Sequence, residues 1–564
     1  MLGNIYSTFN IDFLENRGNI HISPRMVLNT SSADDADFGR PFAIKRYGAN
    51  IWIGAGAVLF TTGTGSSTTY PDDAITQDAT SGTPTNCDAD YSDMDTAFGN
   101  LYVTTSTNAV YKYTGSAWSN FTAGSSSGEV RLLEPFGNRM YMTTSVSKVI
   151  SFDSSNTVAT SGQYTIQVST DTNANIITCL IAGKNKMWIG CYNATGGAGK
   201  VYEWDGSSTQ ATREYVLESA GVLSGVVKDD IPYFMDVEGN LLKYNGASFQ
   251  IIARMKQSPR FFTLPSTSRN TRFIHPNGMT IIRNKINFLI NTQLSDVGSP
   301  IPENLPSGIY EYDEQIGIYH KASLSNNKSG DTITDYGSMR ISVAGPLASV
   351  YAPYTGANIN GSFMAGATYF TSQSATRTGV FYDDLQDTLQ KAGNFVTIKI
   401  ESNNITESWQ EMFIKFKKLL SSSDKIVVKY RTNDVASTEA TITWSDTNTF
   451  TSTADLSAYA VGDEVEITRG VGAGKCAHIT AISSNAGTYT VDLDETFTSA
   501  SGTASARFQK WTKLKSITSQ NIQFDRAGIS QKSPWIQFKV FAIHAGKDEI
   551  ESLIIRHAPN ETAN

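Results

Sequence analysis

The sequence predicts an all-β protein whose first two-thirds form a six- or seven-bladed β-propeller. Two recurring elements carry this prediction. The first is a strand centred on an aromatic residue, which recurs at spacings of 50, 39, 47 and 45 residues: Trp52, Tyr102, Tyr141, Trp188 and Tyr233. The second is a strand that runs into a turn, as at 111–115 (YKYTG), 201–206 (VYEWDG) and 242–246 (LKYNG). A repeat of this length is typical of a propeller blade.

The strands that recur have apolar residues on both sides of the pleat, so both faces must be covered. Blades stacked around an axis cover one another, and closing the ring leaves few open sheet edges. The alternative is a β-sandwich with coincidental turns, which seldom repeats the same pair of elements at such spacing. The sequence therefore favours the propeller.

Composition supports the all-β prediction. The chain has 564 residues, 45 of them glycine, with 11% aromatic and only 17% charged residues, as expected for two to four turn-rich β domains. Helical periodicity is confined to two short candidates, 383–391 and 407–413. The net charge of −8 argues against a dedicated nucleic-acid-binding protein.

The chain carries no sign of a disulfide framework or of a targeting segment. Its four cysteines, Cys87, Cys179, Cys191 and Cys476, match no metal-ligand spacing. Cys179 and Cys191 could meet across a hairpin, although buried free thiols are expected. The first residues lack a signal peptide, and no apolar run approaches the roughly 20 residues of a membrane span. We therefore expect synthesis in a cytoplasm without membrane insertion.

Four parts follow from the order of elements. Residues 1–40 form an N-terminal arm that either completes the last blade or docks on a neighbouring subunit. Residues 41–393 hold the propeller repeats. Residues 394–447 and 507–564 alternate apolar and charged positions, as in a β-sandwich with wet outer faces. Residues 448–506, with flanks rich in Ser, Thr and Ala, form a small β domain inserted in the sandwich.

No motif in the sequence supports catalysis or cofactor binding. The segment 470–476 (GVGAGKC) lacks the spacing of a phosphate-binding loop and precedes a strand, so we interpret it as a hairpin loop. The segment 124–128 (GSSSG) matches a nucleophile elbow only formally, because a strand follows it where a helix is required. The histidines are scattered. We predict no catalytic residue, no cofactor and no firm metal site.

Two clusters are weak candidates for binding. Asp88, Asp90, Asp93 and Asp95 could hold calcium, although the glycine of a calcium loop is missing and solvated acids are favoured. A basic stretch interleaved with phenylalanines could face DNA or an acidic partner, although a solvated surface is favoured. Its residues are Arg254, Lys256, Arg260, Arg269, Arg272, Arg283 and Lys285.

Several segments resemble tail proteins of bacteriophages. The segments 532–540 and 549–556 look like the closing sandwich of propeller-bearing tail proteins, and 18–25 is of the same kind. The segments 461–465 and 479–493 are similar to small β domains of phage virion proteins. This family includes the tail nozzles of short-tailed phages.

The resemblance implies a non-enzymatic structural subunit of the virion tail, of nozzle or hub type, assembled as a cyclic homo-oligomer around or near the DNA channel. It also implies contacts with adaptor, fibre or tail-tip proteins, and with passing genomic DNA without sequence specificity. The alternative is a propeller that binds or cleaves a host polysaccharide, since two catalytic acids from different blades leave no local signature. A weaker third possibility is a cellular scaffold propeller.

Overall fold

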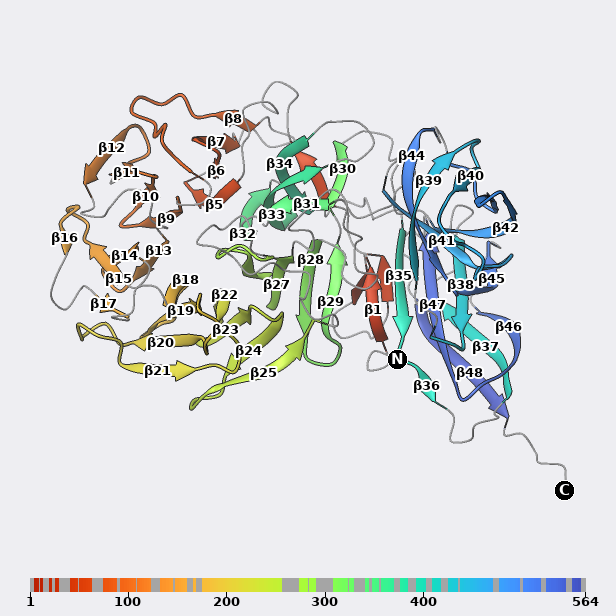
Figure 1. The fold of residues 1–564 in the computed structure, drawn as a ribbon. Helices are drawn as coiled ribbons and strands as arrows, with labels where there is room; N and C mark the ends of the chain where they lie inside the picture. The colour runs from red at the N-terminus through yellow and green to blue at the C-terminus, as the bar shows by residue number, and fades with distance from the viewer. Residues whose placement is uncertain are drawn as a thin grey trace.

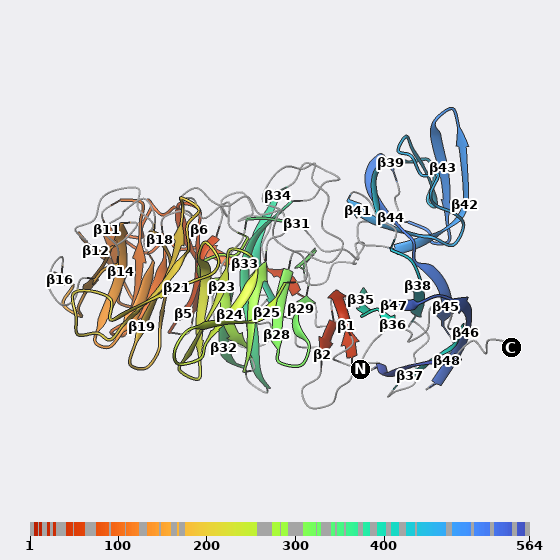
Figure 2. The same ribbon diagram turned by 60° about the horizontal axis from the view of Figure 1, so that its bottom comes forward.

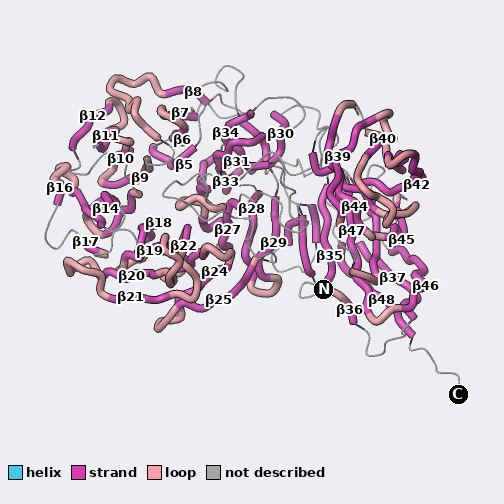
Figure 3. The backbone as a smooth tube through the Cα atoms, viewed as in Figure 1, coloured by secondary structure: helices cyan, strands magenta, loops and turns pink. Residues whose placement is uncertain are grey.

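The computed structural model confirms the all-β prediction, because every regular element that it describes is a strand and most sheets are small and antiparallel (Figures 1 and 3). The structure describes the chain from residue 5 to residue 558, apart from residues 10, 14–19, 23–25, 30–40, 49, 63–74, 89–91, 108, 123–131, 146–147, 160–165, 169–174, 256–272, 283, 291–307, 323, 329–339, 344–346, 355–356, 370–375, 384–391, 402–407, 417–424, 435–436, 470–475, 498–500, 519–523 and 544–549.

Seven small sheets follow one another between residues 41 and 383. The first holds β5 (Pro41–Tyr47), β6 (Asn50–Ala55), β7 (Val58–Thr62) and β8 (Ile75–Gln77). The second holds β9 (Met94–Ala97), β10 (Asn100–Thr104), β11 (Ala109–Tyr113) and β12 (Trp118–Thr122). The third holds β13 (Leu133–Phe136), β14 (Arg139–Ser145), β15 (Lys148–Phe152), β16 (Val158–Ala159) and β17 (Ile166–Gln167).

The next three sheets are four-stranded. The fourth holds β18 (Asn175–Ala182), β19 (Met187–Asn193), β20 (Lys200–Trp204) and β21 (Arg213–Val216). The fifth holds β22 (Val222–Lys228), β23 (Ile231–Asp236), β24 (Asn240–Tyr244) and β25 (Phe249–Arg254). The sixth holds β26 (Met279–Ile282), β27 (Lys285–Ile290), β28 (Gly308–Asp313) and β29 (Gly317–Ala322).

The seventh sheet brings the two ends of the series together. It holds β30 (Leu324–Lys328), β31 (Arg340–Val343), β32 (Leu347–Tyr354), β33 (Ala357–Tyr369) and β34 (Thr376–Asp383), and β34 pairs with β4 (Met26–Asn29) from the N-terminal arm. The first strands of the first six sheets contact one another in order, from β5 through β9, β13, β18 and β22 to β26, and β32 of the seventh sheet contacts both β26 and β5. The seven sheets therefore close into a ring (Figure 1).

Contacts between neighbouring sheets explain the two recurring sequence elements. The aromatic residue in the second strand of one sheet packs against the aromatic residue in the third strand of the next. Ring centroids lie 4.8 Å apart for Trp52–Tyr113, 5.1 Å for Tyr102–Phe152, 5.1 Å for Tyr141–Trp204 and 4.9 Å for Trp188–Tyr244. Such contacts add to the burial of large apolar side chains. The aromatic residues of the two recurring elements therefore fill the space between neighbouring sheets.

The turn between the first and second strands explains the recurring glycine. Gly48, Gly99 and Gly137 have φ of +61°, +71° and +59°, a region that glycine occupies without strain. The fifth sheet lacks the glycine and uses Asp229 and Asp230, with φ of +52° and +62°. Aspartate tolerates this region better than most residues, so the same hairpin forms without glycine.

A sandwich follows the ring. One sheet holds β1 (Ile5–Phe9), β35 (Ala392–Thr397), β36 (Ile400–Glu401), β38 (Lys425–Arg431), β45 (Thr512–Ile517) and β47 (Trp535–Ile543). The other holds β2 (Ile11–Phe13), β3 (Ile20–Ile22), β37 (Ser408–Phe416), β46 (Phe524–Lys532) and β48 (Ile550–Ala558). Tyr319 of β29 joins the sandwich core, and β29 contacts β1 and β2. The arm therefore supplies strands to both the ring and the sandwich.

A closed barrel lies between β38 and β45. It holds β39 (Thr438–Trp444), β40 (Thr449–Ser452), β41 (Glu464–Arg469), β42 (Cys476–Asn485), β43 (Thr488–Leu493) and β44 (Thr503–Gln509). The predicted inserted domain began at residue 448, which wrongly assigned β39 to the sandwich. Ala440, Ile442 and Trp444 of β39 are buried in the barrel core. The polar run after β39 is the β39–β40 hairpin turn and not a linker.

The candidate helix at 407–413 is wrong, because this segment lies almost wholly in β37. The register of β37 shifts between Trp409 and Glu411, as at a β-bulge. The bulge places Trp409 and Met412 on the same face although they are three residues apart, and both are fully buried in the sandwich core. The extra residue thus imitates helical spacing in the sequence. The other candidate helix, 383–391, lies outside the described residues beyond Asp383.

Candidate functional site

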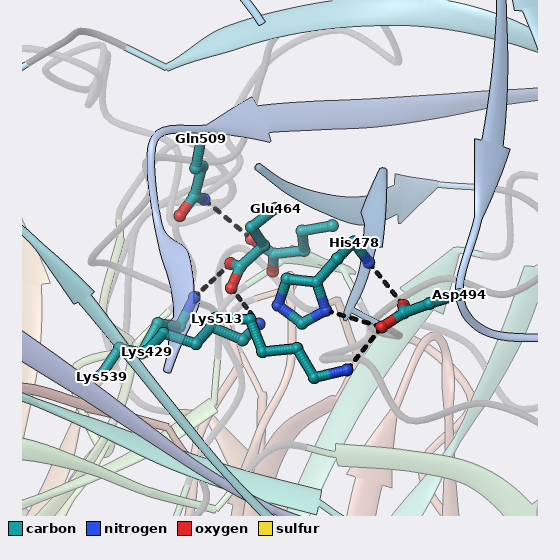
Figure 4. A network of polar contacts seen from close by, with 8 residues as sticks. Lys429, Glu464, His478, Asp494, Gln509, Lys513 and Lys539 are labelled. Atoms are coloured by element: carbon teal, nitrogen blue, oxygen red, sulfur yellow. Dashed lines mark hydrogen bonds and ion pairs between the residues drawn. The ribbon is translucent and has the colours of Figure 1, made fainter. Parts of the chain in front are cut away.

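The barrel docks on the sandwich through a buried ionic cluster (Figure 4). Glu464, at the start of β41, is fully buried and its carboxylate pairs with two sandwich lysines. Lys539 Nζ of β47 lies 2.6 Å from Glu464 Oε1, and Lys429 Nζ of β38 binds Oε2. We call Lys429, Glu464 and Lys539 the Lys–Glu–Lys clamp.

Strand register explains why the clamp needs a glutamate. Lys429 and Lys539 are direct cross-strand partners in the sheet of β38 and β47. Like charges placed opposite one another destabilise a sheet, and burial of uncompensated charge costs much more. Lys429 and Lys539 face away from the sandwich core, which Val428 and Val540 enter from the same strands. The outer face of this sheet therefore requires an acidic group from the barrel.

Electrostatics at the clamp favour the ionised carboxylate. Burial alone would raise the pKa of Glu464, but the positive charges of Lys429 and Lys539 outweigh it and lower the pKa to about 2. The neighbouring Cys476 thiol shows the opposite effect, because burial and the negative charge of Glu464 raise its pKa to about 12. A thiol with this pKa stays protonated and is a poor nucleophile.

A second set of polar contacts flanks the clamp. His478 Nδ1 lies 3.1 Å from Asp494 Oδ2, and Lys513 Nζ of β45 lies 2.7 Å from the same oxygen. Burial lowers the pKa of His478, although the hydrogen bond to Asp494 opposes this. Asp494 in turn is held ionised: burial raises its pKa, but hydrogen bonds from His478 and Lys513 lower it well below the usual range. The clamp and this second set of polar contacts both join barrel side chains to lysines of the sandwich.

The inside of the ring holds a second set of charged groups. Lys45, Asp95 and Glu134 occupy the same register position in the first strands of three successive sheets, opposite Trp52, Tyr102 and Tyr141 respectively. Lys45 Nζ lies 2.9 Å from Asp95 Oδ2, and Glu134 Oε1 accepts a hydrogen bond from the backbone of Ala182 in the next sheet. Lys45 and Glu134 thus reach the following sheet, whereas Asp95 binds the preceding one.

Glu134 is the most perturbed acid of this set. Burial and the nearby charge of Asp95 raise its pKa to about 8, against the opposing effect of Lys45. A carboxyl group of this kind exchanges its proton near neutral pH.

A hydrogen bond spans the ring interior between sheets that are not neighbours. Asn277, which precedes the sixth sheet, donates from Nδ2 to Asp93 Oδ1 at 2.8 Å, and Asp93 precedes the second sheet. Asp93 Oδ2 also accepts from the backbone of Leu133 at 2.9 Å. Asp93 is almost fully buried, so its carboxylate is committed to internal partners.

The sixth sheet carries a further buried acid on the side of the sandwich. Glu311 lies 2.7 Å from Lys321 Nζ and 3.3 Å from Lys285 Nζ, and it accepts a hydrogen bond from Tyr319, which enters the sandwich core. Burial would raise the pKa of Glu311, but the two lysines and Tyr319 lower it below its usual range. The tyrosine at the ring–sandwich contact is therefore held from the ring side.

The described members of the predicted acidic cluster, Asp88, Asp93 and Asp95, have separate partners. Asp93 is held by Asn277 and Leu133, while Asp95 pairs with Lys45. The backbone of Asp88 interacts with Ser92, and Asp90 lies outside the described residues. Across the described residues, no group of three or more His, Cys, Asp or Glu side chains is placed to hold a metal ion.

Only two residues of the predicted basic stretch are described. Arg254 is exposed at the end of β25. Lys285 is largely buried and pairs with Glu311 and Asp313, so its charge is neutralised inside the sixth sheet. The others, Lys256, Arg260, Arg269, Arg272 and Arg283, lie outside the described residues.

The cysteines and the two glycine-rich segments were the other features singled out in the sequence. All four cysteines are free thiols, so Cys179 and Cys191 form no disulfide. The segment 470–475 lies outside the described residues, but the strands flanking it, β41 and β42, pair antiparallel as a hairpin requires. The segment 124–128 also lies outside them. Within the described part of the chain, no helix is long and apolar enough to cross a membrane.

Comparisons with known proteins identify no family. No family model matches the chain, and no curated protein matches it. Among solved structures, the extracellular domain of the putative hybrid two component system BT4673 from B. thetaiotaomicron is similar over 71% of this chain and 44% of its own, with 13% identity and a TM-score of 0.40. YCF48 bound to D1 peptide is similar over 66% of this chain and 98% of its own, with 9% identity and a TM-score of 0.38.

BamB from Moraxella catarrhalis is similar over 44% of this chain and 68% of its own, with 13% identity and a TM-score of 0.29. The chain spans less than half the length of the BT4673 domain. Likenesses at this level carry no functional argument.

Proposed function

We propose that this chain is a non-enzymatic structural subunit of a bacteriophage tail, of nozzle or hub type. In this proposal, residues 41–383 and the arm strand β4 form a seven-bladed β-propeller. The subunit assembles as a cyclic homo-oligomer in the virion tail and contacts adaptor, fibre or tail-tip proteins. The sequence resemblance suggests a virion protein, and the buried contacts between the domains suggest a rigid subunit.

The buried clamp between barrel and sandwich is the observation that carries the proposal. A subunit that keeps its shape while DNA passes needs its parts fixed relative to one another. Glu464 fixes the barrel to two opposed lysines of the sandwich, and removal of one partner from such a cluster is strongly unfavourable. The arm adds to this by pairing with both the ring and the sandwich.

The DNA path in this proposal lies between subunits and not along the axis of one ring. The hydrogen bond between Asn277 and Asp93 crosses the interior of the ring. Lys45, Asp95 and Glu134 also meet within it. A duplex would therefore pass through the centre of an assembly of copies, in contact with their outer surfaces.

Electron microscopy and native mass spectrometry of the purified chain test this proposal. We expect closed rings of a fixed number of copies. Gold-labelled antibodies against the chain should bind the tails of virions of the encoding phage. A chain that stays monomeric at micromolar concentration and is absent from virions would contradict the proposal.

A polysaccharide-cleaving ring is a second candidate, favoured by Asp95 and Glu134. Two carboxyl groups in different environments, one with its pKa raised to about 8, are the arrangement that an acid–base pair requires. A glycan array and a reducing-sugar assay test this candidate, with Glu134→Gln as the inactive control. Glycan binding or sugar release that Glu134→Gln abolishes would favour it over the structural role.

A further inference from the structure

The outer face of one sandwich sheet carries an exposed aromatic and basic patch. Phe413 of β37 lies directly opposite Ile554 of β48 on one side and Arg526 of β46 on the other. Residues that lie directly opposite in antiparallel strands share a face. Phe524 stacks on Phe413 at 5.4 Å, and the Arg556 guanidinium lies 4.9 Å from the Phe413 ring. We call Phe413, Phe524, Arg526, Ile554 and Arg556 the sandwich patch.

The sandwich patch is exposed beyond what a solvated sheet face requires. Phe524 is 52% exposed and Ile554 is 53% exposed, although each belongs to a residue type that is usually inside. The alternate residues Met412 and Ile414 of β37 are fully buried in the core, so the patch plays no part in the sandwich interior. Aromatic residues beside arginine are the composition of interface hot spots.

The barrel lies on the opposite side of the sandwich. It packs on the outer face of the sheet of β38 and β47, through Lys429 and Lys539, whereas the sandwich patch lies on the other sheet (Figure 2). Each subunit therefore presents the barrel at one side and the sandwich patch at the other. Contacts between two such different surfaces are heterologous, and they generate rings when the rotation closes.

The barrel and the sandwich carry net charges of opposite sign, as a contact between the barrel of one copy and the sandwich of another requires. The barrel, residues 438–509, has nine Asp and Glu against three Lys and Arg, a net charge of −6. The sandwich segments 392–431 and 512–558 have fourteen Lys and Arg against eight Asp and Glu, a net charge of +6. Within one copy, four of these cations already pair with Glu464, Asp494 and Glu495 of the barrel, which leaves a net charge of +2 on the sandwich and −3 on the barrel: they are Lys425, Lys429, Lys513 and Lys539. On the barrel, Asp446 and Asp455 are exposed, and Val461 is 65% exposed.

We infer that the sandwich patch binds the acidic barrel of a second copy of this chain. The inference rests on the proposed function, because it names the surfaces that would build the cyclic oligomer. Val461 would supply the apolar contact for Phe524 and Ile554, and the barrel acids would face Arg526. Arg556 already lies 3.7 Å from Glu411 of its own sheet. A single-stranded nucleic acid fits less well, because the chain carries a net charge of −8.

Phe524→Asp and, independently, Ile554→Asp test the inference in the full chain. Native mass spectrometry and analytical ultracentrifugation should show oligomeric wild type and self-association weakened at least about 30-fold in each variant, as for an interface hot spot. The matched control is Val216→Asp, which alters a 65% exposed apolar residue on β21 of the ring and should leave the oligomer intact. Both patch positions are exposed, and an unchanged thermal midpoint shows that the fold is kept.

Carbodiimide cross-linking of mixed light and heavy copies identifies the partner surface. We expect inter-copy links from Lys415, beside the patch, to Asp446 or Asp455 of the barrel, and weaker association in 1 M NaCl. Oligomers that persist in both patch variants, or links that avoid the barrel, would overturn this inference and leave the proposed oligomer standing. Single-stranded DNA binding that Phe524→Asp abolishes in an unchanged oligomer would assign the patch to nucleic acid instead. A monomeric wild type would overturn the proposed function itself.

Discussion

Substitution of Glu464 by glutamine tests whether the Lys–Glu–Lys clamp stabilises the chain. The change keeps the shape of the side chain but leaves Lys429 and Lys539 opposed and buried without a counter-charge. Loss of one partner from a buried ion pair costs roughly 3–5 kcal/mol. The lowering of the Glu464 pKa from 4.5 to about 2 gives about 3 kcal/mol independently, at 1.36 kcal/mol for each pKa unit. We expect Glu464→Gln to lower the free energy of unfolding by about 3 kcal/mol at pH 7.

The same linkage fixes how this difference depends on pH. The folded-state pKa of Glu464 lies below its unfolded value, so its contribution is complete above about pH 4.5 and is lost as the pH falls toward 2. The difference between wild type and Glu464→Gln should therefore fall to roughly half at pH 3. Urea unfolding followed by tryptophan fluorescence measures it, because Trp444 is buried in the barrel core and Trp511 is buried beside Lys539.

Glu466→Gln is the matched control for this experiment. Glu466 lies on the same strand, two residues away, and its carboxylate is 28% exposed and 3.4 Å from Arg507. A partly exposed pair contributes roughly 1 kcal/mol or less, so this variant should remain close to wild type. A Glu464→Gln variant that is equally close to wild type at pH 7 would refute the argument that the barrel is held by buried charge.

Three further predictions concern the ring and the cysteines. Trp188→Ala should destabilise the ring by roughly 3–5 kcal/mol, seen as a lower thermal midpoint, because it removes the contact with Tyr244 in the next sheet; an unchanged midpoint would contradict the inter-sheet packing. Glu134→Gln should reduce the pH dependence of stability between about 5 and 8, because a raised folded-state pKa makes wild type less stable as pH rises through this window; chemical denaturation at several pH values measures it, and parallel wild-type and variant profiles would contradict it. Ellman's reagent at pH 8 should react with the cysteines only after unfolding, since Cys87, Cys179 and Cys191 are buried and burial raises the pKa of Cys476 to about 12; rapid reaction of the folded chain would refute this.

The sequence predicted the strands best where packing repeats. Trp52 and Trp188 stand out because each must fill the same space between two sheets, and that space recurs around the ring. Domain boundaries were predicted less well where consecutive strands pair within different domains. β39 follows the sandwich strand β38 directly, and only its pairing with β40 and β44 assigns it to the barrel. Long-range pairing of this kind leaves no mark in local composition.

The charged clusters could not be found from the sequence for a related reason. Glu464 is one of several acids in a polar strand, and its two lysines lie 35 and 75 residues away. Lys45, Asp95 and Glu134 are similarly dispersed, although their common distance from the aromatic residue of the next strand is a signal that an alignment of the repeats would show. The acidic run at 88–95 was conspicuous by local density, and its described members are used for internal hydrogen bonds instead.

The position of the barrel in the chain and its charge are consequences of the same constraint. The sandwich pairs Lys429 directly with Lys539, an arrangement that a free sheet face would disfavour. Apolar residues at these positions would stabilise the sheet equally well. The two lysines are therefore best explained by the domain that they allow to pack on this face. Only a domain that offers a carboxylate at that point can cover this face, and its orientation is fixed by two bonds to one side chain. The barrel enters the chain directly after β38, which carries Lys429, and leaves it before β45 on the same sheet. Insertion there keeps Glu464 within reach of both lysines in every folded molecule.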